Sequence, residues 1–331
     1  MQTHRLHAVT LCAAWLGVCA CASHTYAQKA GDYPSKPIRW IVASPSGGAP
    51  DVIARLVGTR LTDAWGQPVV LDFRPGAGTT IGTELAAHAA PDGHTLLFGQ
   101  VSSLAINPTL MGKRLGFDPF RDFAPVSGLV AGAHLLVVNS TVPATSVQEL
   151  IKVAKARPGQ LSYASSGPGT SNHLGMELLK LLAGIDMVHV PYKGSTPGII
   201  DTASGQVQAM LNVMPALLPH VKAGRLRGLA VSSEQRSAIA PEIPTVAEAG
   251  VPGFGYVAWF AMLAPARTPR EIVGKLNAQV VRILAEPQTA KVLAAQGMEP
   301  MGTTPQGLTQ LMREDTARWK KVIEAAHIRV D

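Results

Sequence analysis

Short apolar, β-branched runs alternate with amphipathic helical stretches along most of this chain. The first run, residues 37–43 (PIRWIVA), precedes residues 50–65, where apolar side chains recur at helical spacing. Strand-like and helix-like segments then follow each other through residues 68–99 and again from residue 135 to residue 232. This alternation predicts an α/β fold with mostly parallel sheets, because a helix must carry the chain back before the next parallel strand.

The C-terminal part of the chain is mainly helical. Thr268, Pro269 and Glu271 form a capping-box pattern that predicts a helix start, and Thr304-Pro305 predicts another. No low-complexity linker separates two halves. Two domains that exchange strands are therefore expected, with crossings near residues 130–138 and 257–265.

The first 27 residues have the pattern of a secretory signal peptide, with Arg5 before an apolar run and small residues near Ala27. Cys12, Cys19 and Cys21 are the cysteines of the chain, so cleavage near Ala27 removes all of them. The exported protein would then have no disulfide and no thiolate, which favours the bacterial periplasm. Lipoprotein anchoring at Cys21 is the less favoured alternative, because another cysteine lies just before it.

Composition excludes several classes of protein. A hydrophobic content of 47% excludes a disordered chain, and no apolar stretch after residue 30 is long enough to span a membrane. The formal net charge of +7 is scattered. This favours mild attraction for anionic ligands over binding to nucleic acid.

Motifs for catalysis, metals and nucleotides are missing or incomplete. The chain has no His-Glu-x-x-His, no Gly-x-Ser-x-Gly and no Walker-type loop, and its histidines show no i, i+4 pair. Residues 76–82 (GAGTTIG) look like a dinucleotide loop, but the last glycine comes one residue late, which favours a tight turn. We therefore expect no metal, no cofactor and no enzyme activity.

Two loops rich in glycine and serine stand at predicted helix starts. Residues 44–51 (SPSGGAPD) follow the first strand, and residues 165–173 (SSGPGTSNH) follow a strand in the second half. Such loops place free backbone N–H groups and a helix dipole where an anion can bind. One loop in each half is what a two-lobed clamp would need. Asp51 would repel an anion at the first loop, so contacts from Ser46, Gly47 or Gly48 must outweigh it.

Two further segments follow strands that would end at the same edges. Ser102 and Ser103 follow the strand at residues 95–99, and Tyr192 and Lys193 follow a strand of the second half. Ligands of α/β proteins bind at the carboxyl ends of strands. Lys193 is either a countercharge for the ligand or a solvated lysine.

Several segments, in order, resemble the substrate-binding proteins of tripartite tricarboxylate transporters, the Bug/TctC family. They include YPSKPIRWIVASPSGGAPDVIAR, RPGAGTTIGTELAAHAAPDGHTLL, YASSGPGTSNHLGMELL and HVPYKGSTPGIIDTASGQVQ. The resemblance covers residues 33–331. It implies a two-lobed type II periplasmic-binding-protein fold that closes on a small carboxylate, with lobe 1 at residues 33–130 plus 250–331 and lobe 2 at residues 131–249.

The resemblance also implies which residues bind the ligand. An aspartate is frequent in the family where Asn212 stands, so this chain lacks a negative partner for a ligand ammonium group. The candidate ligand-binding residues are Pro45, Ser46, Gly47, Gly48, Ser102, Ser103, Ser165, Ser166, Gly167, Gly169, Thr170, His173, Tyr192 and Asn212.

The function expected from these observations is capture of a small organic carboxylate in the periplasm and delivery to the membrane subunits of a transporter. A monomer is expected. One alternative is a ligand sensor that docks on a signalling receptor, which would use the same fold and site. The other is a secreted serine hydrolase that uses Ser166 or Ser171 with His173, although no nucleophile turn or acid partner supports it.

Overall fold

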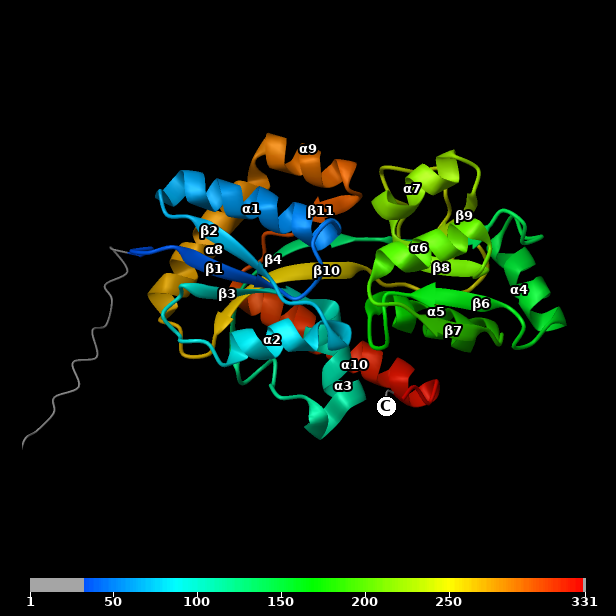
Figure 1. The fold of residues 1–331 in the computed structure, drawn as a ribbon, viewed down its shortest axis with the longest axis horizontal. Coiled ribbons are helices and arrows are strands. Elements are labelled where there is room, and N and C mark those ends of the chain that lie inside the picture. Colours follow the sequence, from blue (N-terminus) through cyan, green and yellow to red (C-terminus); the bar gives the residue numbers. More distant parts are fainter. Residues whose placement is uncertain (1–32, 330–331) are drawn as a thin grey trace, which may run out of the picture.

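Two β-sheets, each between layers of helices, form two lobes that lie side by side (Figure 1). The computed structural model describes residues 33–329, so the predicted signal peptide and the three cysteines lie outside the described residues. No helix among residues 33–329 is long and apolar enough to cross a membrane.

The sheet of lobe 1 has the strand order β11-β4-β10-β3-β1-β2. Its strands are β1 (Ile38–Val42), β2 (Val69–Phe73), β3 (Thr95–Gln100), β4 (Phe123–Gly132), β10 (Ala258–Pro265) and β11 (Met298–Pro300). Strand β1 pairs in parallel with β2 and β3, whereas β10 is antiparallel to both of its neighbours. The first three strands therefore end at one edge, which carries the first predicted anion-binding loop.

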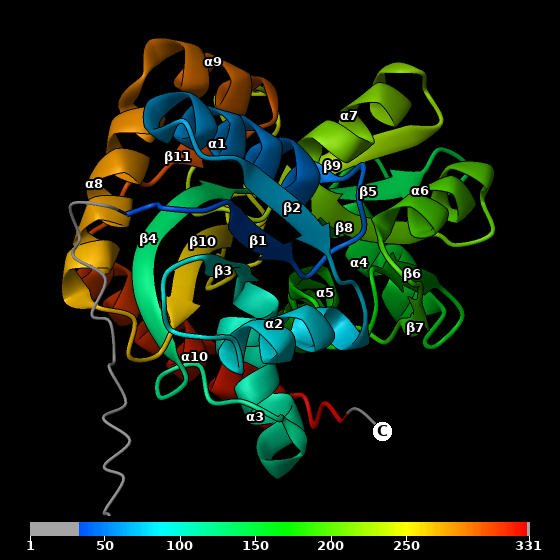
Figure 2. The same ribbon diagram turned by 60° about the vertical axis from the view of Figure 1, so that its left-hand side comes forward.

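Helices cover both faces of this sheet (Figure 2). One face packs against α1 (Ala49–Trp65) and α8 (Arg270–Ala285), with α9 (Pro287–Ala295) beside them. The other face packs against α2 (Thr80–Ala87) and α10 (Pro305–Ala325), and the short α3 (Asn107–Met111) lies against α10.

The sheet of lobe 2 has the strand order β7-β6-β8-β5-β9. Its strands are β5 (His134–Asn139), β6 (Ser162–Ser165), β7 (Val188–Pro191), β8 (Ala209–Val213) and β9 (Leu226–Val231). One face carries α4 (Val147–Ala156) and α5 (Ser171–Ala183), and the other carries α6 (Ser195–Ser204) and α7 (Met214–Lys222). Strands β6, β7 and β8 are parallel, while β5 is antiparallel to β8 and β9.

The chain changes sheets twice, and a buried polar network joins the two crossings. Only Ala133 separates β4 from β5, and the return path runs from β9 to β10. The His134 N–H donates to Ser232 Oγ at 2.9 Å, and Ser232 Oγ donates to the Tyr256 carbonyl at 2.9 Å. His134 Nδ1 lies 2.8 Å from the Tyr256 hydroxyl. These hydrogen bonds join the two segments that cross between the lobes, so the crossings are held side by side.

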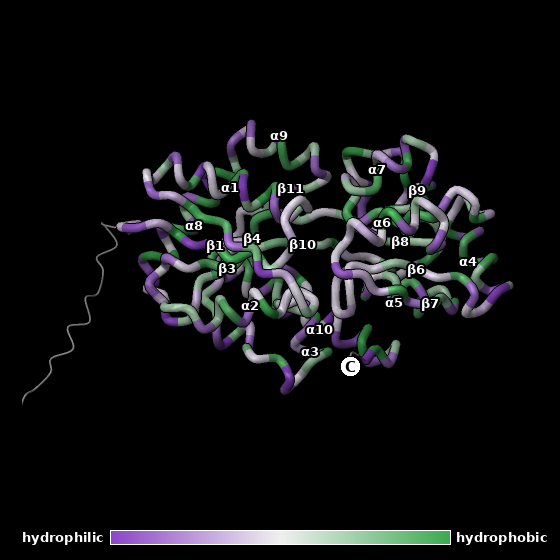
Figure 3. Tube along the Cα trace, viewed as in Figure 1, coloured by the Kyte–Doolittle hydropathy of each residue, from purple (hydrophilic) through white to green (hydrophobic). Residues whose placement is uncertain are grey.

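The C-terminal helix α10 extends the core of lobe 1 toward lobe 2. It packs against β4 and also against α5. The fully buried Trp319 meets Tyr256 edge-on at 5.2 Å between ring centroids. Buried apolar residues on this side form one cluster that includes Leu97 of β3, Trp319 and Leu174 of α5. In Figure 3 the strands of both lobes are largely hydrophobic, as buried sheets require.

The predicted α/β class and two-lobed architecture are confirmed, with three differences in detail. Both sheets are mixed, because strands exchanged between the lobes run against their neighbours. Helix α9 and strand β11 were missed. Thr268 does not cap α8, since its hydroxyl donates to the Pro265 carbonyl at 2.7 Å, while Thr304 does cap α10 by accepting from the Gly307 N–H at 3.0 Å. The predicted lobe boundaries stay a prediction.

Candidate functional site

The first predicted loop connects β1 to α1 at the edge of lobe 1, and Pro45, Ser46, Gly47 and Gly48 are all exposed. Gly48 is the N-cap of α1 and provides no side-chain cap. The Gly47 N–H, however, donates to Asp51 Oδ2 at 2.8 Å. One of the donors expected for the ligand is therefore already satisfied by the chain's own carboxylate.

Asp51 is held in place at this helix end. Its Oδ1 lies 2.6 Å from Arg55 Nε, and the residue is buried. The Ser46 and Gly48 N–H groups make no hydrogen bond within residues 33–329 and face solvent. These two amides are the donors that the first loop can offer to an anion.

The second predicted loop, residues 165–170, is braced by its own polar groups. Ser165 Oγ accepts from the Gly167 N–H at 3.1 Å, and Thr170 Oγ1 lies 2.6 Å from the Gly167 carbonyl. Asn172 Nδ2 donates to Ser166 Oγ at 2.8 Å. The Gly167 amide is thus engaged inside the loop, which corrects the expectation of free N–H groups there.

The free N–H donors of lobe 2 lie in the first turn of helix α5, because the Gly167 and Gly169 N–H groups already have partners. It begins at Ser171, and its N-cap Thr170 makes no capping hydrogen bond to the first turn. The N–H groups at the start of a helix have no partner within the helix, so an uncapped first turn can receive an anion. Ser166 Oγ lies 2.8 Å from Ser195 Oγ, which adds the start of α6 to the same surface.

The loops of the two lobes approach each other closely. A Cβ atom placed on Gly78 of lobe 1 would lie 2.8 Å from the Pro168 carbonyl oxygen of lobe 2. One placed on Gly169 would collide with Asn107 Oδ1, and one placed on Gly194 would lie 3.7 Å from Pro45 Cγ. We call this region, formed by Pro45, Gly78, Asn107, Pro168, Gly169 and Gly194, the interlobe surface.

His173 lies behind the second loop and carries no charge at neutral pH. Its ring stacks on His189 with 4.0 Å between centroids, and its Nδ1 accepts from the Gly169 N–H at 3.3 Å. Burial lowers the pKa of His173 to about 3 and the pKa of His189 to about 4. The pair therefore supports the loop as neutral rings and provides no countercharge for an anion.

The serine that pairs with a histidine is Ser165, neither Ser166 nor Ser171. Ser165 Oγ lies 2.6 Å from His189 Nε2, but the side chain is fully buried at the end of β6. A nucleophile must be reachable by its substrate. This arrangement positions the loop and gives no support to the hydrolase alternative.

Ser102 and Ser103 start a π-helical turn, Ser102–Ile106, directly after β3. Both are buried, and Ser103 Oγ donates to the Gln100 carbonyl at 3.4 Å. Gln100 Nε2 in turn donates to Ser44 Oγ at 2.7 Å. The carboxyl ends of β1 and β3 are thereby joined beneath the first loop, and π-turns are frequent at functional sites.

Tyr192 and Asn212 differ in how their polar groups are used. The Tyr192 hydroxyl donates to Asp201 Oδ2 at 2.6 Å, and burial, with Asp201 beside it, raises the pKa of Tyr192 to about 12.

Asn212 lies at the carboxyl end of β8 and is only 3% exposed. Its Oδ1 accepts from the Val213 N–H, but its Nδ2 has no partner within residues 33–329. An unsatisfied buried donor lowers the stability of the fold by about 1–3 kcal/mol, so we expect a ligand or a water molecule to accept a hydrogen bond from Asn212 Nδ2.

The comparisons with known proteins identify the family of this chain. The family model described as "Tripartite tricarboxylate transporter family receptor", TctC, matches residues 53–328. The chain belongs to the TctC family.

Relatives and solved structures cover almost the whole chain. Protein BugT of Bordetella pertussis is 39% identical over 295 residues, covering 89% of this chain and 90% of BugT. Rpa4515 of R. palustris, solved with adipate, is 38% identical with a TM-score of 0.86, covering 90% of this chain and 99% of that one. MatC of Rhodopseudomonas palustris, solved with malate, is 32% identical with a TM-score of 0.81, covering 88% and 100%.

Sequence reasoning missed some residues of this TctC chain that the structure brings to the interlobe surface. Gly78 lies in the turn that was considered only as a nucleotide loop, and Asn107 belongs to the same segment as Ser102 but was not among the candidate ligand-binding residues. Asn107 Nδ2 donates to the Gly78 carbonyl at 2.8 Å. A polar residue at the start of a short helix next to the predicted site was the available signal for Asn107.

Proposed function

We propose that this chain captures a small organic carboxylate between its lobes and passes it to the membrane subunits of a tripartite tricarboxylate-type transporter. The observation that carries this proposal is the pair of uncapped helix starts, α1 on lobe 1 and α5 on lobe 2, next to the same interlobe surface. Two helix dipoles and their unpaired N–H groups favour a shared anionic ligand.

The ligand class follows from the charges near these helix starts. Asp51 and Asp201 are the acidic groups noted there, and both are engaged, with the Gly47 amide and Tyr192 respectively. Asn212 offers an amide donor that suits an oxygen acceptor and offers no charge for an ammonium group. We infer a dicarboxylate without an amino group, a class to which the adipate of Rpa4515 and the malate of MatC belong.

The site is proposed to comprise the loop amides at Ser46 and Gly48, the first turn of α5, Ser166, and Asn212. Ser102, Ser103 and His173 would position these groups, because they are buried behind the loops. Export to the periplasm with cleavage near Ala27, and function as a monomer without a cofactor, complete the proposal.

A thermal-shift screen of organic acids at neutral pH tests the ligand class. A ligand at 100 times its dissociation constant stabilises the native state by about 2.7 kcal/mol, which shifts the melting temperature by roughly 5–10 °C. We expect adipate, malate or a related dicarboxylate to give such a shift. The matching diamide, which has no charge for the helix ends, should give almost none; a screen in which only sugars or amines stabilise the protein contradicts the proposal.

A further inference from the structure

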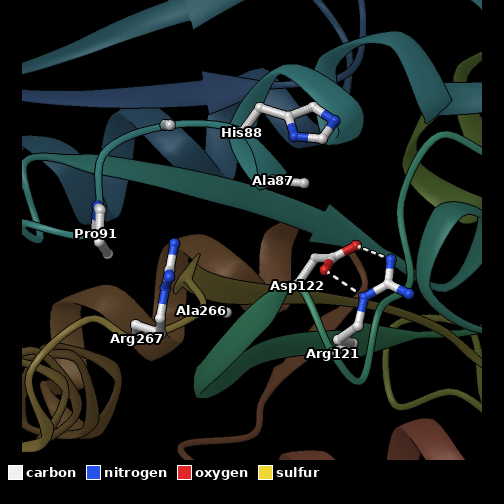
Figure 4. Close-up of a pocket in the computed structure, with 8 residues that line it drawn as sticks. Ala87, His88, Pro91, Arg121, Asp122, Ala266 and Arg267 are labelled. Carbon is white, nitrogen blue, oxygen red and sulfur yellow. Dashed lines mark hydrogen bonds and ion pairs between the residues drawn. The ribbon is translucent and has the colours of Figure 1, made fainter.

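A polar pocket lies at the far end of lobe 1, away from the interlobe surface. It has a volume of about 440 Å³ and is lined by Ala87, His88, Ala89, Pro91, Arg121, Asp122, Ala266 and Arg267 (Figure 4). Strand β10 runs from the lobe crossing at Ala258 to Pro265, and the pocket begins directly after it. The eight residues of β10 correspond to roughly 25 Å, so the two places are well separated.

The backbone of Arg267 has a conformation that residues with a Cβ atom rarely adopt. Its φ angle is +68°, in the left-handed region. It stands in the turn closed by the Thr268 N–H, which donates to the Pro265 carbonyl at 3.2 Å, at a position where glycine or asparagine is preferred. Non-glycine residues held in such conformations are concentrated at functional sites.

The Arg267 side chain gains no partner that would compensate for this strain. Its guanidinium makes no hydrogen bond or ion pair within the part of the chain that the structure describes. In Figure 4 it extends from the β10–α8 turn into the space between Pro91 and the Arg121–Asp122 pair. The turn is also fixed there, because the Ala266 N–H donates to the Asp122 carbonyl at 2.9 Å.

The exposed Arg267 side chain has no counter-ion among the charged residues that line the pocket. Arg121 and Asp122 form a two-point ion pair, with Nε–Oδ1 at 2.8 Å and Nη2–Oδ2 at 2.9 Å. The pair lowers the pKa of the Asp122 carboxyl, which therefore stays ionised and neutralises Arg121. One free guanidinium thus faces a pocket with small apolar walls from Ala87, Ala89 and Ala266.

We propose that this pocket is a second, peripheral binding site for a small organic anion. Arg267 meets the carboxylate, and the alanine and proline walls contact the apolar body of the ligand. A guanidinium binds a carboxylate through paired N–H groups, and a pocket of this volume suits a small molecule. The site is independent of the interlobe surface, and the strained turn is retained because it directs Arg267 into the pocket.

Amide-resolved NMR of the purified protein, titrated with sodium benzoate as the probe, tests this site. Benzoate should produce saturable shifts at residues 87–92 and 266–268, whatever happens at residues 46–49 and 171–173. Benzamide, its uncharged counterpart, should produce none. Arg267→Gly should weaken this binding at least tenfold, and Arg270→Ala, which removes a neighbouring exposed positive charge outside the pocket, should change it less than twofold.

The melting temperature without probe gives an independent readout. Arg267→Gly removes a side chain from a left-handed position, so it should raise the melting temperature by about 2 °C while it loses binding. A lowered melting temperature would mean that the guanidinium stabilises the turn, and would overturn the proposal. Absence of saturable shifts in the pocket, an equal loss in Arg270→Ala, or binding of inorganic phosphate but not benzoate would overturn it as well.

Discussion

At the scale of single residues, the candidate site combines donors that are satisfied with donors that are left open. The Asp51 carboxylate accepts from the Gly47 N–H, and Ser165 Oγ of the second loop accepts from the Gly167 N–H. The open groups are the Ser46 and Gly48 amides, the first turn of α5, and Asn212 Nδ2. These open groups are the ones that the proposed dicarboxylate would contact on both lobes.

Gly48→Val tests the first loop. Gly48 has an ordinary extended backbone, with φ −99° and ψ −177°, and a Cβ there would meet only Pro50 Cδ at 3.6 Å. The fold should therefore persist while the valine covers the loop amides, so carboxylate binding should fall at least 100-fold by calorimetry, with unchanged circular dichroism. Gly274→Val, on the exposed side of α8, where a Cβ would meet nothing within 4 Å, is the control. Wild-type affinity in Gly48→Val would mean that the ligand binds elsewhere.

The neutral histidines behind the second loop predict how stability depends on pH. Burial holds the pKa of His173 at about 3 and of His189 at about 4, below the usual value of about 6.5. The unfolded chain therefore binds more protons between these values and the usual one. The stability that these rings contribute is present above about pH 6.5 and is lost as the pH falls toward 4.

Urea unfolding between pH 7 and pH 4.5 measures this effect. The free energy of unfolding should decrease on acidification, and His189→Gln should reduce the number of protons taken up on unfolding by about one. An equal pH slope in wild type and variant would show that His189 titrates normally in the folded protein.

At the scale of elements, alternating patterns predicted most strands and helices of both sheets. The first helix, predicted at residues 50–65, begins one residue before its predicted start and ends where it was predicted to end. Strand β11, of three residues, and α9, which follows α8 with only Glu286 between them, were missed, because short elements give little periodicity. The mixed strand directions depend on contacts between residues over a hundred positions apart, which local pattern cannot reveal.

Part of the candidate site could also be predicted from the sequence. The glycine-serine loops are continuous in sequence, so residues 45–48 and 165–170 could be identified from composition and position. Which amides stay open depends on Asp51, Ser165 and His173, whose side chains turn back on their own loops. The approach of Asn107 to Gly169 is set by the docking of one lobe on the other.

Helix α10 offers a test of the shared core. Trp319 is fully buried among residues of both lobes, so Trp319→Ala should lower the free energy of unfolding by about 3–5 kcal/mol. The exposed Lys320→Ala on the same helix should change it by less than about 0.5 kcal/mol. Chemical denaturation of the two variants gives the comparison. A small effect of Trp319→Ala would show that α10 does not hold the lobes in one cooperative unit.

At the scale of the whole molecule, the lobes meet through loops and are linked by the paired crossings near His134 and Tyr256. Helix starts on separate lobes can contact one small ligand only when the lobes approach, so the bound state gains from closure. Small-angle scattering should show a smaller radius of gyration on saturation with ligand. Gly48→Val at the same ligand concentration should keep the larger radius. An unchanged wild-type radius would indicate a rigid, preformed site.

We propose that uncapped helix starts of both lobes contact the same carboxylate ligand. Amide-resolved NMR with adipate, or with the acid that gives the largest thermal shift, measures this most directly. We expect the amides of Ser46 and Gly48 in lobe 1 and of Ser171 to His173 in lobe 2 to shift together, with one dissociation constant. Shifts confined to one lobe, or two different dissociation constants, would contradict it.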